Sequence, residues 1–162
     1  MAGSDALTDY LRDHLAGARI AADLLESMGS EHAGEQLGRF AIELLAEIEA
    51  DRKVLEDLLE RVGGERLAAL KEGAAWLTQK VSLLKLRRHA GHDLGTLESL
   101  ETLALGIQGK RSLWRALAEI APGNEHLKRT DFDALVARAE QQHARVEERR
   151  LEAARVVLRT AS

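Results

Sequence analysis

Four ionisable residues lie where the helical pattern of this chain calls for apolar side chains. They are His14, Glu47, Asp51 and Lys110. Asp51 falls on the apolar stripe of residues 37–62, and Glu47 lies one turn before it on the same face. Carboxylates beside an imidazole and an ammonium group can form a buried ion-paired network, and carboxylates with imidazole can also bind a metal ion. The spacing therefore predicts a polar pocket in the interior of a helical protein.

The distances along the chain favour contact between the first two of these groups. His14 lies 16 residues before Ser30, and Glu47 lies 17 residues after it. If a turn near Ser30 joins two antiparallel helices, equal rise per residue puts His14 and Glu47 at one height. A buried charge is costly unless it is paired, so we expect His14 and Lys110 to meet the carboxylates of Glu47 and Asp51.

An alternative explanation treats each residue separately. Lys110 can extend its ammonium group to solvent, Asp51 can lie at the edge of its stripe, and His14 can make one ordinary hydrogen bond in the core. A buried network predicts that Asp51→Ala destabilises strongly, whereas an exposed Asp51 predicts almost no effect. The sequence leaves both explanations open.

The elements that must position these residues are long helices. Ser4 can cap a first helix that Gly29 ends, and Ser30 can cap a second helix that Gly63 and Gly64 end. So short a turn makes the two helices antiparallel neighbours. The apolar stripe of the second helix consists of Leu37, Ala41, Leu44, Ile48, Leu55, Leu58 and Val62.

Three further helices are expected. The pattern predicts a third helix over residues 65–88, a break at 89–96, and a fourth helix from about Thr96 that ends at residues 122–124, Pro-Gly-Asn. Thr130, followed by acidic residues, signals the start of a fifth helix that runs nearly to the end. Five such helices around one core indicate an all-α bundle, with residues 1–162 as a single domain.

Composition excludes several classes of function. The chain has no cysteine, which removes thiolate metal sites and cysteine nucleophiles. With 27 acidic and 23 basic residues it has a formal charge of −4, so we expect no nucleic-acid partner. No stretch approaches 18 consecutive apolar residues and no signal peptide is apparent, so we expect a cytoplasmic protein without a membrane-spanning segment.

The last helix contains Glu140-Gln141-Gln142-His143, and the arrangement of two helix pairs with a crossover resembles the ferritin-like superfamily. The segments at residues 14–17 and 47–51 resemble an uncharacterised bacterial branch of it. Di-iron members use Glu-x-x-His on two helices, which makes Glu140 and His143 candidate metal ligands here. The second helix has no matching histidine, so the resemblance implies a degenerate metal site and no bound cofactor, with iron or manganese as the alternative.

Two functions follow as hypotheses. The first is a non-catalytic binding or structural protein with a buried polar cluster of His14, Glu47, Asp51 and Lys110. The thin apolar stripe of the last helix makes a homodimer the expected assembly, and the sequence does not identify a small-molecule ligand. The alternative is a non-standard carboxylate and histidine oxidase with two iron or manganese ions. It would use His14, Glu47, Asp51, Glu140 and His143, all converging on one cavity.

Overall fold

The computed structural model describes residues 2–63 and 92–159. Within these ranges the chain forms four α-helices, which are α1 (Ala2–Glu31), α2 (Gln36–Gly63), α4 (His92–Ile120) and α5 (Phe132–Val157). A short 3₁₀ helix, η3 (Ala121–Gly123), follows α4, and the described residues contain no strand. The all-α class is confirmed. The described part has four α-helices where the sequence predicted five in all, and the expected third helix at 65–88 lies outside it.

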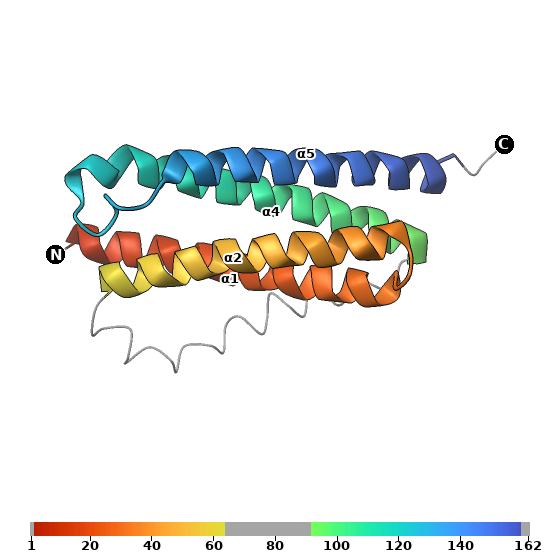
Figure 1. Cartoon of the computed structure of the whole chain (residues 1–162), viewed down its shortest axis with the longest axis horizontal. Coiled ribbons are helices and arrows are strands. Elements are labelled where there is room, and N and C mark those ends of the chain that lie inside the picture. Colours follow the sequence, from red (N-terminus) through yellow and green to blue (C-terminus); the bar gives the residue numbers. More distant parts are fainter. Residues whose placement is uncertain (1, 64–91, 160–162) are drawn as a thin grey trace.

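The four helices run side by side as two antiparallel pairs (Figure 1). α1 packs along α2, and α4 packs along α5, while the pairs meet through α1 with α4 and, more sparsely, α2 with α5. The end of α2 and the start of α4 lie at opposite ends of the bundle (Figure 1). Neighbouring helices are therefore antiparallel, and α2 and α4 run in the same direction.

The turn between α1 and α2 differs from the prediction. Gly29 does not end α1, which continues to Glu31, and Ser30 lies within that helix instead of capping the next one. The turn spans residues 32–35 and contains Gly34 at φ +85°, a left-handed conformation that glycine adopts without strain. Gly29 is tolerated inside α1 because the helix packs closely there, with Ile42 of α2 only 3.3 Å from where a Cβ would lie.

The second pair follows the predicted boundaries more closely. α4 begins at His92, inside the predicted break, and ends at Ile120, where Pro122 and Gly123 stop it as expected. The N-cap of α5 is Asp131, whose Oδ1 accepts a hydrogen bond of 2.9 Å from the Ala134 amide. Thr130, the start of the predicted N-terminal signal, lies one residue before this cap.

The apolar stripes face a common interior. The predicted positions Ala41, Leu44, Ile48, Leu55 and Leu58 of α2 are all buried. The largest fully buried apolar side chains of α1 and α4 are Leu11, Leu25, Leu100, Leu103, Ile107, Leu113, Trp114 and Leu117, and α5 adds Phe132, Leu135, Ala139 and Val146. Among the described residues no helix is long and apolar enough to cross a membrane.

Candidate functional site

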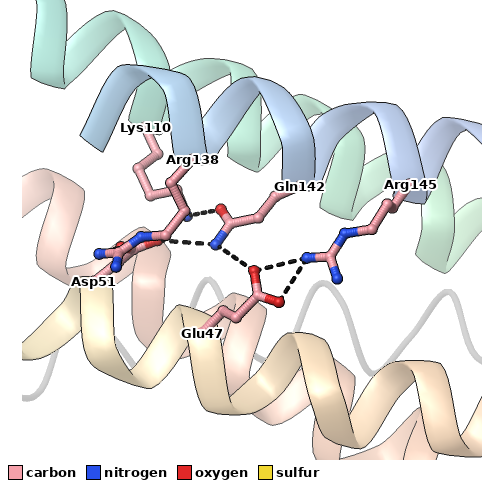
Figure 2. Close-up of polar contacts among 6 residues, drawn as sticks. All are labelled: Glu47, Asp51, Lys110, Arg138, Gln142 and Arg145. Atoms are coloured by element: carbon pink, nitrogen blue, oxygen red, sulfur yellow. Dashed lines mark hydrogen bonds and ion pairs between the residues drawn. The ribbon is translucent and has the colours of Figure 1, made fainter. Parts of the chain in front are cut away.

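Asp51 is the centre of a buried polar cluster. It lies on the apolar face of α2, between Ile48 and Leu55, and only 3% of it is exposed. Its Oδ2 accepts hydrogen bonds from the Lys110 ammonium group of α4 and, at 3.2 Å, from the Gln142 amide of α5. Its Oδ1 accepts a hydrogen bond from the Arg138 guanidinium of α5 (Figure 2). One carboxylate thus joins three helices.

Gln142 connects this centre to a second ion pair. Its side chain is fully buried, and its Oε1 accepts a hydrogen bond from Lys110. Its Nε2 donates to Asp51 and also to Glu47 at 3.1 Å. Glu47 in turn accepts hydrogen bonds of 2.6 and 2.7 Å from Arg145 (Figure 2). These side chains form one network, which we call the Asp51 cluster. Its six members are Glu47, Asp51, Lys110, Arg138, Gln142 and Arg145.

Burial and pairing act in opposite directions on the ionisable members. Burial lowers the pKa of Lys110, because an ammonium group loses hydration in the interior, and the nearby Asp51 carboxylate only partly restores it. Partial burial alone would raise the pKa of Glu47, but hydrogen bonds from Arg145 and Gln142 outweigh it, so that pKa lies below its ordinary value. Both shifts result from the packing of α2 against α4 and α5.

The structure brings together three of the four residues predicted to cluster. Glu47, Asp51 and Lys110 belong to one hydrogen-bonded network, but His14 makes no hydrogen bond to any of them within the described part of the chain. Its ring instead packs edge-on against Tyr10, with centroids 4.7 Å apart. Burial lowers the pKa of His14, and the neighbouring Asp13 partly opposes that effect.

The position of the first turn explains why His14 does not meet Glu47. The expected pairing counted residues from a turn at Ser30, whereas the observed turn is centred between residues 32 and 35. Because the turn comes later in the chain, the part of α2 that lies opposite His14 is nearer to Leu55 than to Glu47. His14 and Leu55 accordingly line the same cavity, together with Asp51.

Three members of the Asp51 cluster, Gln142, Arg138 and Arg145, were not among the four residues predicted to cluster. Arg138 and Arg145 are long, partly exposed side chains that read as part of a solvated helix face. They lie four residues before and three residues after Gln142, which is the spacing of one helical face. That spacing is the signal that could have identified them, because it puts two cations on the face that carries the buried amide.

A cavity of about 80 Å³ adjoins the cluster. Its wall is mainly apolar, and its polar members are His14, Asp51, Arg52 and Lys110. The other residues of its wall come from α1, α2 and α4 and are Gly17, Ala18, Ala21, Ile48, Leu55, Gly106, Ile107, Leu113 and Trp114. Trp114 is 1% exposed, and its indole N–H has no hydrogen-bond partner among the described residues.

Two helix-interior glycines lie at the mouth of this cavity. Gly17 of α1 and Gly106 of α4 are exposed and line the cavity, and no described atom lies within 4 Å of where a Cβ would be on either of them. Neither glycine has the positive φ or the close backbone approach that would require it. Their effect is to leave space where α1 and α4 face each other.

Glu140 and His143 of α5, which the sequence proposed as metal ligands, are not members of the Asp51 cluster. Glu140 is exposed and accepts a hydrogen bond of 2.9 Å from Arg111, and His143 is half-buried. Across residues 2–63 and 92–159, no three histidine, aspartate or glutamate side chains gather where they could hold a metal ion. The carboxylates of Glu47 and Asp51 are instead paired with cationic side chains.

A larger, open depression of about 320 Å³ lies between α2 and α5. Three arginines and two glutamates line it, and Arg145 already pairs with Glu47, so the remaining two cations and two anions balance. The residues that line it are Gln36, Arg39, Phe40, Glu43, Arg145, Glu148 and Arg149.

Comparison with known proteins gives no further guide to the site: no protein-family model matches the chain, and neither curated proteins nor solved structures include a significant match.

Proposed function

We propose that the protein is a non-catalytic binding protein that holds a small organic ligand in the cavity between α1, α2 and α4. The observation that carries this proposal is the pair of glycines, Gly17 and Gly106, at the mouth of a cavity whose wall joins apolar side chains to the Asp51–Lys110 ion pair. Ligand sites of this kind are typically apolar with a few placed polar groups.

The glycines support the proposal because they are costly. A glycine in a helix interior destabilises by roughly 0.5–1 kcal/mol relative to alanine. At Gly17 and Gly106 a methyl group would meet no described atom within 4 Å, so packing does not require the smaller residue. Glycine at both positions leaves the cavity open, and an open apolar cavity can admit a ligand.

The size of the cavity sets the size of the ligand. An apolar cavity of about 150 Å³ is large enough to bind benzene. The cavity here has about half that volume. We therefore propose a ligand, or a terminal group of a ligand, of no more than about six non-hydrogen atoms, the number in benzene.

The course of the chain supports a ferritin-like architecture as part of the proposal. α2 ends and α4 begins at opposite ends of the bundle, so α2 and α4 run in the same direction (Figure 1). A single long crossover between two antiparallel pairs is typical of ferritin-like folds. The oxidase with two iron or manganese ions has no such support, because Glu47 and Asp51 are engaged by cations and Glu140 pairs with Arg111.

A homodimer in the cytoplasm completes the proposal. Three apolar side chains near the end of α5, Leu151, Val156 and Leu158, are exposed and supply a surface for a second copy. Sedimentation velocity tests this part: a monomer at micromolar concentration would contradict the dimer. Fractionation of cells that express the tagged chain tests its location.

Binding itself can be tested with xenon and the neutral probe butyramide, followed by NMR shifts of the Trp114 indole. We expect saturable binding by the native chain and its loss in the double variant Gly17→Leu/Gly106→Leu, whose side chains fill the cavity mouth. Gly109→Ala is the matched control, because Gly109 also lies inside α4 with open space around it but does not line the cavity. Absence of saturable binding, or equal binding by the double variant, would contradict the proposal.

A further inference from the structure

We infer that the ligand of this cavity is a small monocarboxylate whose short apolar tail lies among the aliphatic side chains and whose carboxylate pairs with Lys110. This inference rests on the proposed binding function and adds the chemical class of the ligand. It follows from the hydrogen-bond donors left over in the cavity wall, from the charge of the adjoining cluster, and from the shape of the apolar part.

Lys110 has a donor to offer. An ammonium group carries three N–H donors. Two are used within the described residues, by the carboxylate of Asp51 and by the side-chain oxygen of Gln142. The third has no partner there, although Lys110 lines the cavity and its side chain is only 14% exposed. A ligand oxygen in the cavity would satisfy it.

Trp114 provides a second observation that points to a missing acceptor. Its ring lines the cavity, and its indole N–H is buried without a partner in the described structure. Leaving a buried donor unpaired is unfavourable, and such groups are rare in native proteins. Because Trp114 can only donate and Lys110 can only donate, the complementary ligand is rich in acceptors.

The charges of the Asp51 cluster favour an anionic acceptor over a neutral one. The cluster contains two carboxylates, Glu47 and Asp51, and three cations, Lys110, Arg138 and Arg145. The buried carboxylate of Asp51 pairs with both Lys110 and Arg138, and the cluster as a whole has one more cation than it has carboxylates. The remaining cation of the wall, Arg52, is balanced by surface carboxylates at 3.0 and 3.4 Å. A carboxylate ligand would neutralise the excess.

The rest of the wall fits a short hydrocarbon tail. Beyond the polar members and Trp114 it consists of aliphatic side chains and of glycine and alanine, which offer no hydrogen-bonding side-chain groups. Within about 80 Å³ a carboxylate leaves room for only a few methylene or methyl groups. Butyrate meets these requirements, and butyramide has the same shape without the charge.

The experiment compares butyrate with butyramide by NMR titration of the native chain at pH 7 and constant ionic strength. We expect butyrate to bind at least about tenfold more tightly. Lys110→Met should reduce the affinity for butyrate to that for butyramide, and Trp114→Phe should weaken butyrate binding several-fold. Lys128→Met is the matched control, since Lys128 is an exposed lysine that pairs only with Glu125, and it should leave both affinities unchanged.

The outcomes separate the inference from the proposed function. If butyrate and butyramide bind the native chain equally well, the inference is wrong while a binding cavity remains. If xenon, butyramide and butyrate all fail to bind, both are wrong. The comparison of the two probes on the native chain needs no variant, so it decides the question even if Lys110→Met does not fold.

Discussion

Asp51→Ala is the perturbation that tests the Asp51 cluster most directly. It removes the only carboxylate that the described structure gives to Lys110, whose side chain is 14% exposed, and to Arg138, whose side chain is 38% exposed. Stranding a buried partner costs about 3–5 kcal/mol. Arg138 can turn toward water, so the loss comes mainly from Lys110 and should be close to 3 kcal/mol.

The assay is chemical and thermal unfolding followed by circular dichroism. For a chain of this size 3 kcal/mol corresponds to a fall in the melting temperature of about 6–12 °C. The matched control is Glu140→Ala, which removes a surface ion pair to Arg111 whose side chains are 53% and 34% exposed. Such pairs contribute about 0–1 kcal/mol, so this variant should change the melting temperature by no more than a few degrees.

A double variant separates lost pairing from lost packing. In Asp51→Leu/Lys110→Met both charges are replaced by apolar side chains of similar volume, which is often neutral or stabilising at buried pairs. We therefore expect the double variant to be more stable than Asp51→Leu alone by about 2 kcal/mol or more. The reasoning would be refuted if Asp51→Ala cost less than about 0.5 kcal/mol. It would also be refuted if the stability losses of Asp51→Leu and Lys110→Met simply added in the double variant.

Four other predictions concern two glycines and two titrating groups. Gly38→Ala should destabilise by about 2 kcal/mol or more, because its Cβ would lie 2.1 Å from the His32 carbonyl oxygen; Gly109→Ala should stabilise by up to about 1 kcal/mol in the same unfolding assay. The pKa of Glu47 lies below 4.5 in the folded chain, so its stabilising effect is present above pH 4.5 and is lost as the pH falls through the folded value. Unfolding titrations should show a weaker acid dependence in Glu47→Gln. The pKa of His14 lies below 6.5 in the folded chain, so the free energy of unfolding should fall as the pH drops below 6.5. His14→Leu should remove that part of the slope, and an unchanged slope would contradict the assignment.

Helical periodicity predicted the phase of the helices well. It identified most of the buried positions of α2, because a core-facing stripe is a property of each helix alone. It also singled out Asp51 and Lys110 as polar residues on apolar faces, and these two residues form an ion pair. Both results need only the sequence of one element at a time.

The positions of helix ends were harder to predict, since they depend on contacts between elements. Gly29 and Ser30 have the local propensities of a helix stop and a helix cap, but packing against α2 carries α1 two residues further. That shift was enough to give His14 the wrong partner. The turn itself depends on Gly34 and on the close approach of Gly38 to the His32 carbonyl, which only the folded chain reveals.

Asp51 also interrupts a series of leucines spaced seven residues apart, Leu37, Leu44, Asp51 and Leu58. If all four were leucine, α2 could slide along α4 and α5 by two helical turns, about 10.5 Å, and still bury an apolar row. With aspartate at one position, such a slide would leave Lys110 facing Leu44 without a carboxylate. The charged residue therefore gives the bundle a single alignment, as a buried asparagine does in a coiled coil. The double variant Asp51→Leu/Lys110→Met should therefore permit misaligned packing of α2, visible as peak doubling in NMR spectra.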